Sequence, residues 1–369
     1  MNEYTKRQEA AAQYLRQHGL AAAVLEDTEG RRNISIRYLT GHPGDALLFF
    51  FASGEVILVP WDLHLAEKIA VCSKIIPYTD FERKITNASK HILKKAANEK
   101  AEFQSSTPYP LMLELQKELP EISTVCKDHG FSTFLQEMRS VKTTEEIETY
   151  RTAWEITEEI RREIVSGIKA GTLKTEFDTA MHIEKRCREL GCEGTGFETL
   201  CAGPERSWGI HAFPAYTSGS IQSKGLTIID FGVNYNGYRT DITMTIASGP
   251  LSQKQSTMCS LVEEAYKKAV RSCIIGADST KITGEIQDFF KQNSYSMPHA
   301  LGHGIGLEAH ELPVFRTREK CSMKLKENMV LAIEPGLYDQ EAGGVRLEND
   351  VIITSQGPEI PTKSQIIYI

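Results

Sequence analysis

The sequence has no long hydrophobic run, no CxxC pair and no low-complexity tract. No segment approaches the ~18 consecutive apolar residues that a membrane-spanning helix needs, so we expect no membrane partner. Its eight cysteines are scattered without a CxxC pair. This pattern favours free thiols in a reducing compartment.

Acidic residues outnumber basic residues, so the formal net charge is −7. This balance argues against nucleic acid and anionic membranes as partners. Residues 1–20 lack the apolar core of a signal peptide and read as an amphipathic helix, so we expect a cytoplasmic protein. The length of 369 residues, with 41% hydrophobic and 25% charged residues, is ordinary for a globular protein of two domains.

Two domains are predicted, one over residues 1–127 and one over residues 128–369. The first alternates strands and helices, which is typical of an α/β domain with one sheet. Its predicted strands cover 21–25, 46–51 and 56–59, and its predicted helices cover 61–70 and 81–98. In the second domain, Thr143 and Glu146 indicate the start of a helix that reaches about Ile168. Further helices are predicted over 174–190, 256–273 and 281–292.

Acidic residues end or follow apolar segments in the second half, where a charge is costly unless something compensates it. With one histidine among them, they are Asp230, Asp241, His303, Glu334 and Glu348. Four carboxylates and a neutral imidazole match two divalent cations in charge. Oxygen-rich ligation with one imidazole suits Mn²⁺, Co²⁺, Fe²⁺ or Zn²⁺, and the share of carboxylates favours Mn²⁺.

Asp230 and Asp241 can be placed relative to each other. Residues 226–233 and 238–246 read as strands, and the dipeptide Asn236-Gly237 between them is a strong hairpin turn. This turn pairs Asp230 with Thr243 and Asp241 with Gly232. Both carboxylates then project from one face, roughly 6–8 Å apart at the backbone, where they can converge on shared ions.

Taken singly, each of these residues has a simpler explanation. An aspartate at a strand end is usually a turn or capping residue, and a histidine among glycines is usually structural. Glu334, which precedes Pro335, can simply start a loop. The run GHGIG lacks the lysine and hydroxyl residue of a phosphate-binding loop. The ordered set of five favours a metal centre, because the simpler explanations would have to hold five times independently.

Four segments resemble the pita-bread metallopeptidases: IIDFGVNYNGYRTDIT, HALGHGIGLEAHE, LAIEPGLY and GGVRLENDV. Within that family the chain is most similar to Xaa-Pro dipeptidase (prolidase) and aminopeptidase P. The resemblance covers most of residues 141–369 and extends weakly to RNISIRYLTGHPGDALLFF. It implies an α+β chain, in which a smaller α/β domain precedes a catalytic domain with a curved antiparallel sheet and flanking helix pairs.

The resemblance also implies roles for the candidate ligands. Asp230 would hold one ion, His303 and Glu334 would hold the other, and Asp241 and Glu348 would bridge both. The implied activity is that of a dinuclear-metal-dependent exopeptidase that hydrolyses Xaa-Pro bonds in dipeptides or short peptides through a metal-bridging hydroxide. We therefore expect a short Xaa-Pro peptide as substrate, two divalent ions, with Mn²⁺ first, as cofactor, and a homodimer as the assembly.

Further residues match positions near the substrate. Glu334 would also orient or deprotonate the attacking water. His310 matches a histidine that lies near the substrate and is not a ligand. Arg346 would steady Glu348 or bind a substrate carboxylate.

Two positions depart from the family pattern. The family histidine upstream of the first aspartate usually stands in a Pro-His-Gly context, and here it aligns with His211 in SWGIHAFPAY. A loop histidine without a catalytic role is the alternative at that position. Met244 stands where relatives usually carry arginine, which puts the surroundings of the ligands and the substrate preference in question.

Other functions fit the same fold. One is hydrolysis of a small non-peptide amide, as in creatinase-like relatives, and another is a non-catalytic peptide-binding module. Retention of all five candidate ligands argues against both. Methionine aminopeptidase activity is disfavoured because that enzyme normally lacks a comparable N-terminal domain.

Overall fold

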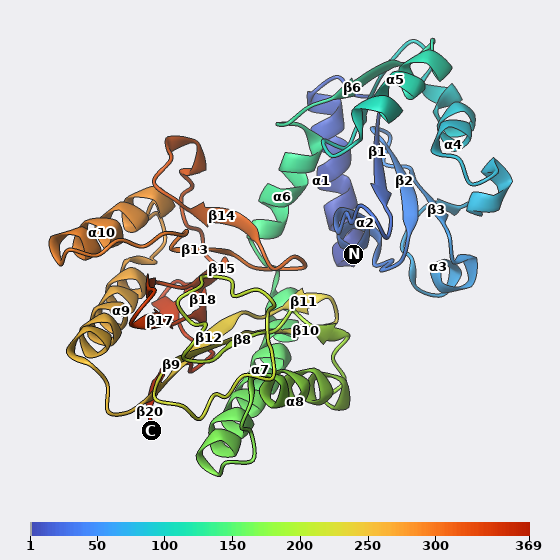
Figure 1. Cartoon of the computed structure of the whole chain (residues 1–369). Coiled ribbons are helices and arrows are strands. Elements are labelled where there is room, and N and C mark those ends of the chain that lie inside the picture. The colour runs from blue at the N-terminus through green and yellow to red at the C-terminus, as the bar shows by residue number, and fades with distance from the viewer. Residues whose placement is uncertain (1) are drawn as a thin grey trace. The chain divides into compact units, whose positions relative to one another are not determined.

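The computed structural model describes residues 2–369, and the chain divides into two compact units (Figure 1). The first unit ends at Met138 and the second spans Arg139–Ile369. The predicted boundary at residue 127 lies before helix α6 (Phe131–Ser140). The rings of Phe131 and Phe134 pack on Tyr14, with centroid distances of 5.9 and 4.3 Å. Most of α6 therefore belongs to the first unit.

The first unit is built on one six-stranded sheet with the order β4-β3-β2-β1-β5-β6. Its strands are β1 (Ala22–Asp27), β2 (Ala46–Phe51), β3 (Val56–Pro60), β4 (Lys74–Ile75), β5 (Lys100–Phe103) and β6 (Ser123–Cys126). β2 runs antiparallel to both β1 and β3, and the other neighbours are parallel. This mixed sheet with helices is the predicted α/β arrangement.

The helices of the first unit largely follow the predicted periodicity. They are α1 (Glu3–Gln17), α2 (Ser35–Thr40), α3 (Leu63–Ile69), α4 (Ile85–Ile92) and α5 (Tyr109–Glu118), with 3₁₀ turns η1 (Tyr78–Phe81) and η2 (Leu93–Ala96). The single helix predicted over 81–98 is wrong in its extent. Glu82 and Arg83 both have φ of 53°, a left-handed conformation that no α-helix continues through.

The second unit contains two helix pairs. They are α7 (Thr144–Lys169) with α8 (Glu176–Glu189), and α9 (Gln253–Ser272) with α10 (Ser279–Gln292). Thr143 and Glu146 form the predicted cap of α7, since each side chain accepts a hydrogen bond from the other residue's backbone N–H. Such a cap is worth about 1 kcal/mol. None of the helices in residues 2–369 combines the length and apolarity that crossing a bilayer requires.

The strands of the second unit form four small sheets, ordered β20-β12-β9-β8, β14-β13-β15-β18-β19, β11-β10-β7 and β16-β17. Their bounds are β7 (Gly194–Thr195), β8 (Leu200–Ala202), β9 (Gly225–Phe231), β10 (Val233–Tyr235), β11 (Tyr238–Arg239), β12 (Ile242–Ser248), β13 (Gly302–Gly304), β14 (Glu311–Phe315), β15 (Val330–Ile333), β16 (Gly336–Asp339), β17 (Gly343–Arg346), β18 (Asn349–Thr354), β19 (Gly357–Glu359) and β20 (Ile366–Tyr368). A further 3₁₀ turn is η3 (Glu319–Cys321). The pairing is antiparallel, as predicted, except between β12 and β20.

Each helix pair covers its own core. Apolar residues of α9 and α10 pack with those of β15, β17 and β18, whereas apolar residues of α7 and α8 pack with those of β9 and β12. The two pairs lie on different sides of the strands in Figure 1. The predicted α+β class, with helix pairs flanking antiparallel strands, is confirmed.

The predicted hairpin register is confirmed where a ladder exists. Tyr235 pairs with Tyr238, and Asp230 pairs with Thr243. At the turn, Asn236 and Gly237 have φ of 49° and 87°, as a two-residue turn of this kind requires.

The predicted pair of Asp241 with Gly232 lies in a break of the ladder. A Cβ at Gly232 would come within 1.7 Å of the carbonyl oxygen of Thr240, so only glycine fits this close approach. The backbone N–H of Asp241 instead donates to Oδ1 of Asp350 over 3.3 Å. The break therefore ties Asp241 to β18.

Candidate metal centre

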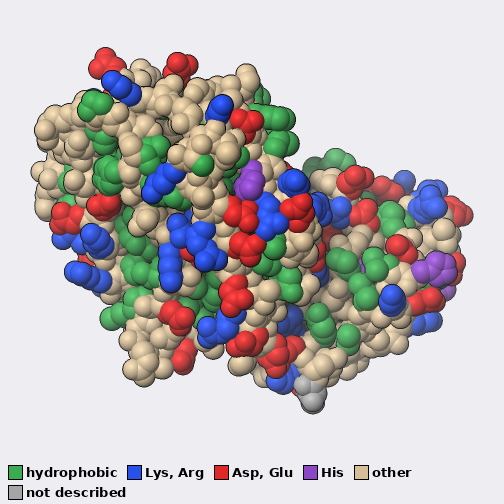
Figure 2. All heavy atoms as spheres, turned by 90° about the horizontal axis from the view of Figure 1, so that it is seen from below, with side chains coloured by type: hydrophobic (Ala, Val, Ile, Leu, Met, Phe, Trp, Pro, Cys, Tyr) green, Lys and Arg blue, Asp and Glu red, His purple; other side chains and the backbone are tan. Residues whose placement is uncertain are grey.

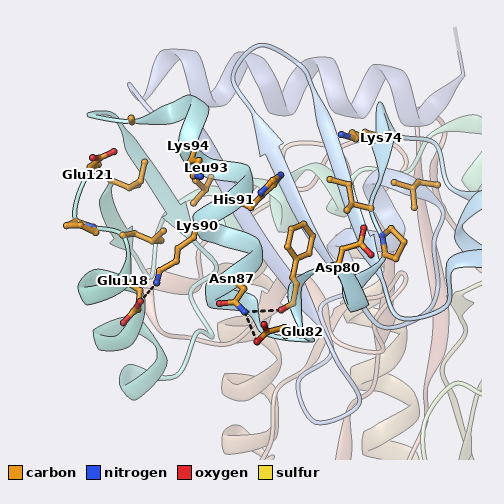
Figure 3. A pocket seen from close by; sticks show the side chains of 18 residues that line it. Lys74, Asp80, Glu82, Asn87, Lys90, His91, Leu93, Lys94, Glu118 and Glu121 are labelled. Atoms are coloured by element: carbon orange, nitrogen blue, oxygen red, sulfur yellow. Dashed lines mark hydrogen bonds and ion pairs between the residues drawn. The ribbon is translucent and has the colours of Figure 1, made fainter.

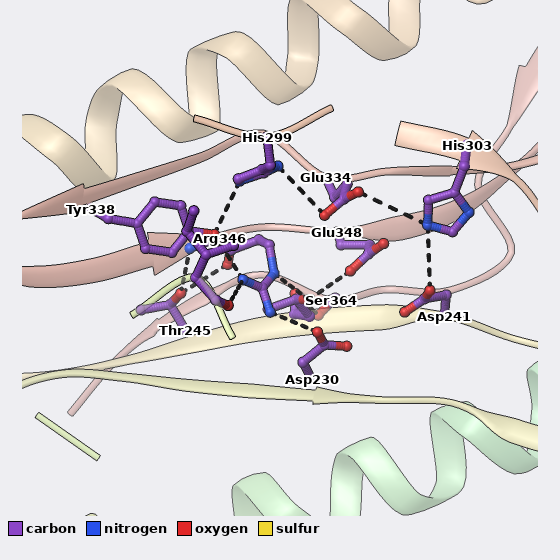
Figure 4. Close-up of polar contacts among 12 residues, drawn as sticks. Asp230, Asp241, Thr245, His299, His303, Glu334, Tyr338, Arg346, Glu348 and Ser364 are labelled. Carbon is purple, nitrogen blue, oxygen red and sulfur yellow. Dashed lines mark hydrogen bonds and ion pairs between the residues drawn. The ribbon is translucent and has the colours of Figure 1, made fainter. Parts of the chain in front are cut away.

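The five candidate ligands come from two sheets that meet in the second unit (Figure 4). Asp230 lies in β9 and Asp241 immediately precedes β12. His303 lies in β13, Glu334 follows β15, and Glu348 lies between β17 and β18. The sheets are joined where the backbone N–H of Glu348 donates to the carbonyl of Thr243 over 3.1 Å.

Three of the five residues converge closely. Ligand atoms of Asp241, His303 and Glu348 all lie within 4.8 Å of one another, and the three side chains are buried. Nε2 of His303 is 3.6 Å from Oδ2 of Asp241 and 3.9 Å from Oε1 of Glu334. Nδ1 of His303 is 3.0 Å from the carbonyl of Gly304. Donation by Nδ1 leaves the lone pair on Nε2, which faces the acids.

Arg346 organises the remaining side of the centre. Its side chain is 1% exposed. Nη2 contacts Oδ2 of Asp230 at 2.6 Å, and Nε donates to Oγ1 of Thr243 over 3.0 Å. Thr243 in turn donates to Oε2 of Glu348 over 2.6 Å. Arg346 therefore steadies Asp230 directly and Glu348 through Thr243, and its burial favours this role over binding a substrate carboxylate.

The electrostatics fit a site for cations. Burial, followed by repulsion from neighbouring acids, raises the pKa of Asp241 and of Glu348 well above their ordinary values. Burial raises the pKa of Glu334 to about 8. Burial lowers the pKa of His303 to about 3, so its imidazole is neutral at pH 7. Within residues 2–369, Oδ1 of Asp230 is buried without a hydrogen-bond partner. Carboxylates crowded beside a neutral imidazole are a donor set that divalent cations stabilise.

The structure brings His310 and His211 to the same region. Both side chains are exposed, and the His310 ring lies 4.3 Å from the His303 ring, centroid to centroid. Loss of hydration, followed by the nearby His211, lowers the pKa of His310. The loop that carries His211 is anchored beside the centre, because Nη1 of Arg346 donates to the carbonyl of Ile210 over 3.1 Å. The equivalence of His211 to the family histidine stays a prediction.

Sequence reasoning missed His299, which stands in the same run as His303. Its Nδ1 lies 3.8 Å from Oε2 of Glu334, and its Nε2 lies 3.1 Å from the hydroxyl of Tyr338. Burial lowers the pKa of His299 to about 4. The spacing HALGH was a usable signal, since it places a second histidine four residues before the predicted ligand. The context of Tyr338 gave no such signal.

Asp350 was also missed. It is fully buried and accepts hydrogen bonds from the Trp154 indole N–H over 2.8 Å and from the Asp241 backbone over 3.3 Å. Burial raises its pKa well above the ordinary value. The sequence shows that an acidic residue, Asp350, lies two positions after Glu348, but it does not show that Trp154 on α7 is its partner.

The departure at Met244 lies outside the centre. Met244 is fully buried in the apolar core with Ile242 and Ile246. Alternation along β12 places these residues on one face and Thr243 on the other. Met244 therefore packs under the sheet, on the face opposite to Thr243.

A separate cavity of about 890 Å³ lies in the first unit and is lined by residues 74–82, by α4 with η2, and by the segment between α5 and β6 (Figure 3). Two pairs of polar side chains interact within it. Lys90 forms an ion pair with Glu118, and Asn87 donates to Glu82 over 3.4 Å. The cavity holds none of the predicted site residues, so the acid cluster of the second unit is the better candidate for catalysis.

Figure 2 shows basic and acidic side chains interspersed on the face viewed from below. This face carries no continuous basic surface of the kind that nucleic-acid binding uses. The exclusion of nucleic acid stays a prediction.

Comparison with known proteins covers both units. Residues 148–355 match the model of metallopeptidase family M24, and residues 7–141 match that of the creatinase/prolidase N-terminal domain. The chain is 35% identical to the Xaa-Pro dipeptidase of Pyrococcus furiosus over 251 residues, which is 68% of each chain. The crystal structure of the prolidase from Pyrococcus horikoshii OT3 superposes with a TM-score of 0.84 at 26% identity, covering 99% of each chain. That of the X-Pro aminopeptidase from Thermotoga maritima MSB8 gives a TM-score of 0.84 at 25% identity, covering 98% of this chain and 99% of the other.

Proposed function

Because the chain belongs to metallopeptidase family M24, we propose that it is a metal-dependent exopeptidase acting on Xaa-Pro bonds of dipeptides or short peptides. The observation that carries the proposal is the convergence of Asp241, His303 and Glu348 within 4.8 Å, in a chain similar to Xaa-Pro dipeptidases. The substrate class has a physical rationale. An Xaa-Pro amide has no N–H, and its ring is incompatible with ordinary extended-strand recognition, so a dedicated site is needed.

The metal centre is proposed to hold two divalent ions, with Mn²⁺ as the preferred metal. Its ligands are Asp230, Asp241, His303, Glu334 and Glu348. Such a pair of ions lowers the pKa of a shared water and offsets negative charge on the scissile carbonyl oxygen. The crowded carboxylates, the neutral imidazole and the unpartnered Oδ1 of Asp230 support this assignment. Anomalous-scattering maps of crystals soaked in Mn²⁺ test it, and maps without two peaks among these side chains would contradict it.

Glu334 is proposed as the general base. Its carboxylate, beside the proposed ions, can take a proton from the attacking water and return it to the departing proline nitrogen. Nδ1 of His299 lies 3.8 Å from one oxygen of this carboxylate. His310 and His211 are proposed to donate hydrogen bonds to the carbonyl oxygen as negative charge develops there.

A hydrolysis panel tests the function. Ala-Pro, Met-Pro, a tripeptide with proline second, and Met-Ala are each incubated with the Mn²⁺-loaded protein. We expect release of the first residue from the proline substrates and little hydrolysis of Met-Ala. Cleavage of Met-Ala in preference to Met-Pro, or no cleavage of any peptide with Mn²⁺, Co²⁺ or Zn²⁺, would overturn the proposal.

The assembly and the location of the protein remain predictions. We propose a homodimer in the cytoplasm, and sedimentation equilibrium of the purified protein tests the first part. A monomer at micromolar concentration would contradict it.

A further inference from the structure

An ion cluster that is buried except at Glu308 includes residues of the loop that carries His310. It joins the start of the second unit to residues 305–311, and its members are Arg139, Lys142, Glu308 and Glu311. The Glu311 carboxylate is 1% exposed. Its Oε1 accepts from Nε of Arg139 over 3.0 Å, and its Oε2 accepts from Nζ of Lys142 over 3.3 Å. Arg139 also pairs with Glu308. The cluster therefore holds two positive and two negative charges, and the Glu308 side chain, which is 43% exposed, is its solvent-facing member.

Glu311 also shapes the loop. The backbone N–H of Glu308 donates to Oε1 of Glu311 over 3.3 Å. A Cβ at Gly306 would lie 2.1 Å from Oε2 of Glu311, so the carboxylate fills the space that this glycine leaves. Although burial alone would raise it, Lys142 and Arg139 hold the pKa of Glu311 below its ordinary value. The carboxylate is therefore ionised and fixed from both sides.

The position of His310 depends on this arrangement. Glu311 follows His310 directly and opens β14, where its partner in β13 is Gly304. The register between the two strands shifts between His303 and Gly304, and the intervening loop returns the His310 ring to the His303 ring. Among residues 2–369, no hydrogen bond holds the His310 ring itself. The backbone at Glu311 and the contact with His303 consequently determine where that ring lies.

We propose that Arg139 and Lys142, acting through Glu311, are positioning residues that hold His310 at the mouth of the metal centre; the catalytic part of this inference rests on the proposed function. Their effect is on the transition state, through the placement of His310, and not on metal binding.

A double-mutant cycle tests this chain of action. Glu311→Gln keeps the size of the side chain but removes its charge. We expect kcat for Ala-Pro to fall on the order of tenfold, with KM changed less than twofold and metal content unchanged. In a His310→Ala background, the same substitution should cause no further fall in kcat. Full additivity of the two losses would overturn the proposal, because it would mean that Glu311 does not act through His310.

A second variant tests the proposal in case Glu311→Gln fails to fold. Arg139→Lys keeps the buried charge but loses the planar guanidinium that contacts both acids, and should retain the fold with an intermediate kcat. Glu158→Gln is the matched control. It breaks the Arg161–Glu158 pair within α7, at 2.9 Å, and should leave kcat unchanged. An Arg139→Lys enzyme with wild-type kcat would contradict the proposal.

A readout without turnover separates this inference from the proposed function. The imidazole NMR signal of His310, identified by its loss in His310→Ala, is followed in Zn²⁺-loaded protein. We expect Glu311→Gln and Arg139→Lys to shift it and Glu158→Gln to leave it in place. If the His310 signal does not shift in Glu311→Gln and Arg139→Lys, the positioning role is contradicted, whatever the activity of these variants. If the wild-type protein cleaves no Xaa-Pro peptide, the proposed function is contradicted, but the NMR test of the positioning role can still be made.

Discussion

Nη2 of Arg346 lies 2.6 Å from Oδ2 of Asp230, and this ion pair is the closest link between a candidate ligand and a non-ligand cation in the centre. The two residues are far apart in sequence, and β17 and β9 bring them together. The pair fixes one Asp230 oxygen and leaves Oδ1 for another partner. Arg346 thereby orients a ligand while neutralising part of the acidic cluster.

Replacing Arg346 should weaken metal binding more than it alters the fold. Arg346→Met removes every donor at similar volume, and we expect Mn²⁺ affinity to fall by roughly 10–100-fold, as for other groups that support ligands. Arg346→Lys should be intermediate, because one ammonium cannot replace a fork that contacts Asp230 and Thr243 together. Calorimetric titration with Mn²⁺ measures both. Arg161→Met is the control, and equal losses of affinity in all three variants would contradict the role.

Glu334→Gln should abolish most turnover. The amide keeps the size of the side chain but cannot accept the proton of the attacking water, so kcat should fall by about 10²–10⁴. Activity is compared at equal, measured metal content, and circular dichroism checks the fold. Near-normal turnover in the metal-loaded variant would exclude Glu334 as the base.

His211→Ala and His310→Ala should each lower kcat without changing metal content. A donor used in the transition state is worth on the order of 2–4 kcal/mol of barrier. Kinetics and metal analysis on the same preparations separate this role from ligation. Metal loss in His310→Ala would make it a ligand, and full activity in His211→Ala would favour a loop histidine without a catalytic role.

Without metal, the stability of the second unit should fall as pH rises from about 6.5 to about 8. Burial raises the pKa of Glu334 to about 8 and those of Asp241 and Glu348 well above their ordinary values. The folded form therefore keeps protons that the unfolded chain has released. Each such group lowers the free energy of unfolding by about 1.4 kcal/mol per pH unit across its window.

Histidines oppose this trend only at lower pH. Burial lowers the pKa of His303 to about 3 from its ordinary 6.5, and that of His299 to about 4. Their contribution to stability rises with pH and is complete near 6.5, so the carboxylates act alone above it. Thermal melts with a chelator, and with saturating Mn²⁺, measure the slope. Metal should remove or reverse it, because the ions bind deprotonated ligands. A flat profile in the chelated protein would contradict the prediction.

Two glycines make a matched pair for stability. Gly232→Ala places a Cβ 1.7 Å from the Thr240 carbonyl oxygen, and should destabilise the fold by about 1–3 kcal/mol or more. It should also disturb Asp241, which follows Thr240. Gly284→Ala, in α10, meets no atom within 4 Å and should stabilise the protein by about 0.5–1 kcal/mol. Denaturant unfolding measures both. Equal effects would show that the close approach at Gly232 does not matter.

Local patterns determined much of the candidate site. Asn236-Gly237 specifies a turn that no neighbouring segment has to impose, and that turn fixed the pairing of Asp230 with Thr243. Acidic residues at the ends of apolar strands would be costly to bury as charged groups, and this cost predicted a shared cation that compensates their charge. The capping residues Thr143 and Glu146 likewise fixed the start of α7 from neighbours in sequence.

Tertiary structure decided what depends on segments that are distant in sequence. The partner of Asp350 is Trp154, nearly two hundred residues away, and the partner of Arg346 is Asp230 on another sheet. The ladder break at Gly232 arises from a backbone approach by Thr240, which no local propensity encodes. The sequence by itself determined the hairpin turn, the cap of α7 and the set of candidate ligands, because these follow from local conformation and from the cost of burying charge. Which oxygen faces which nitrogen was decided only when the two sheets packed together.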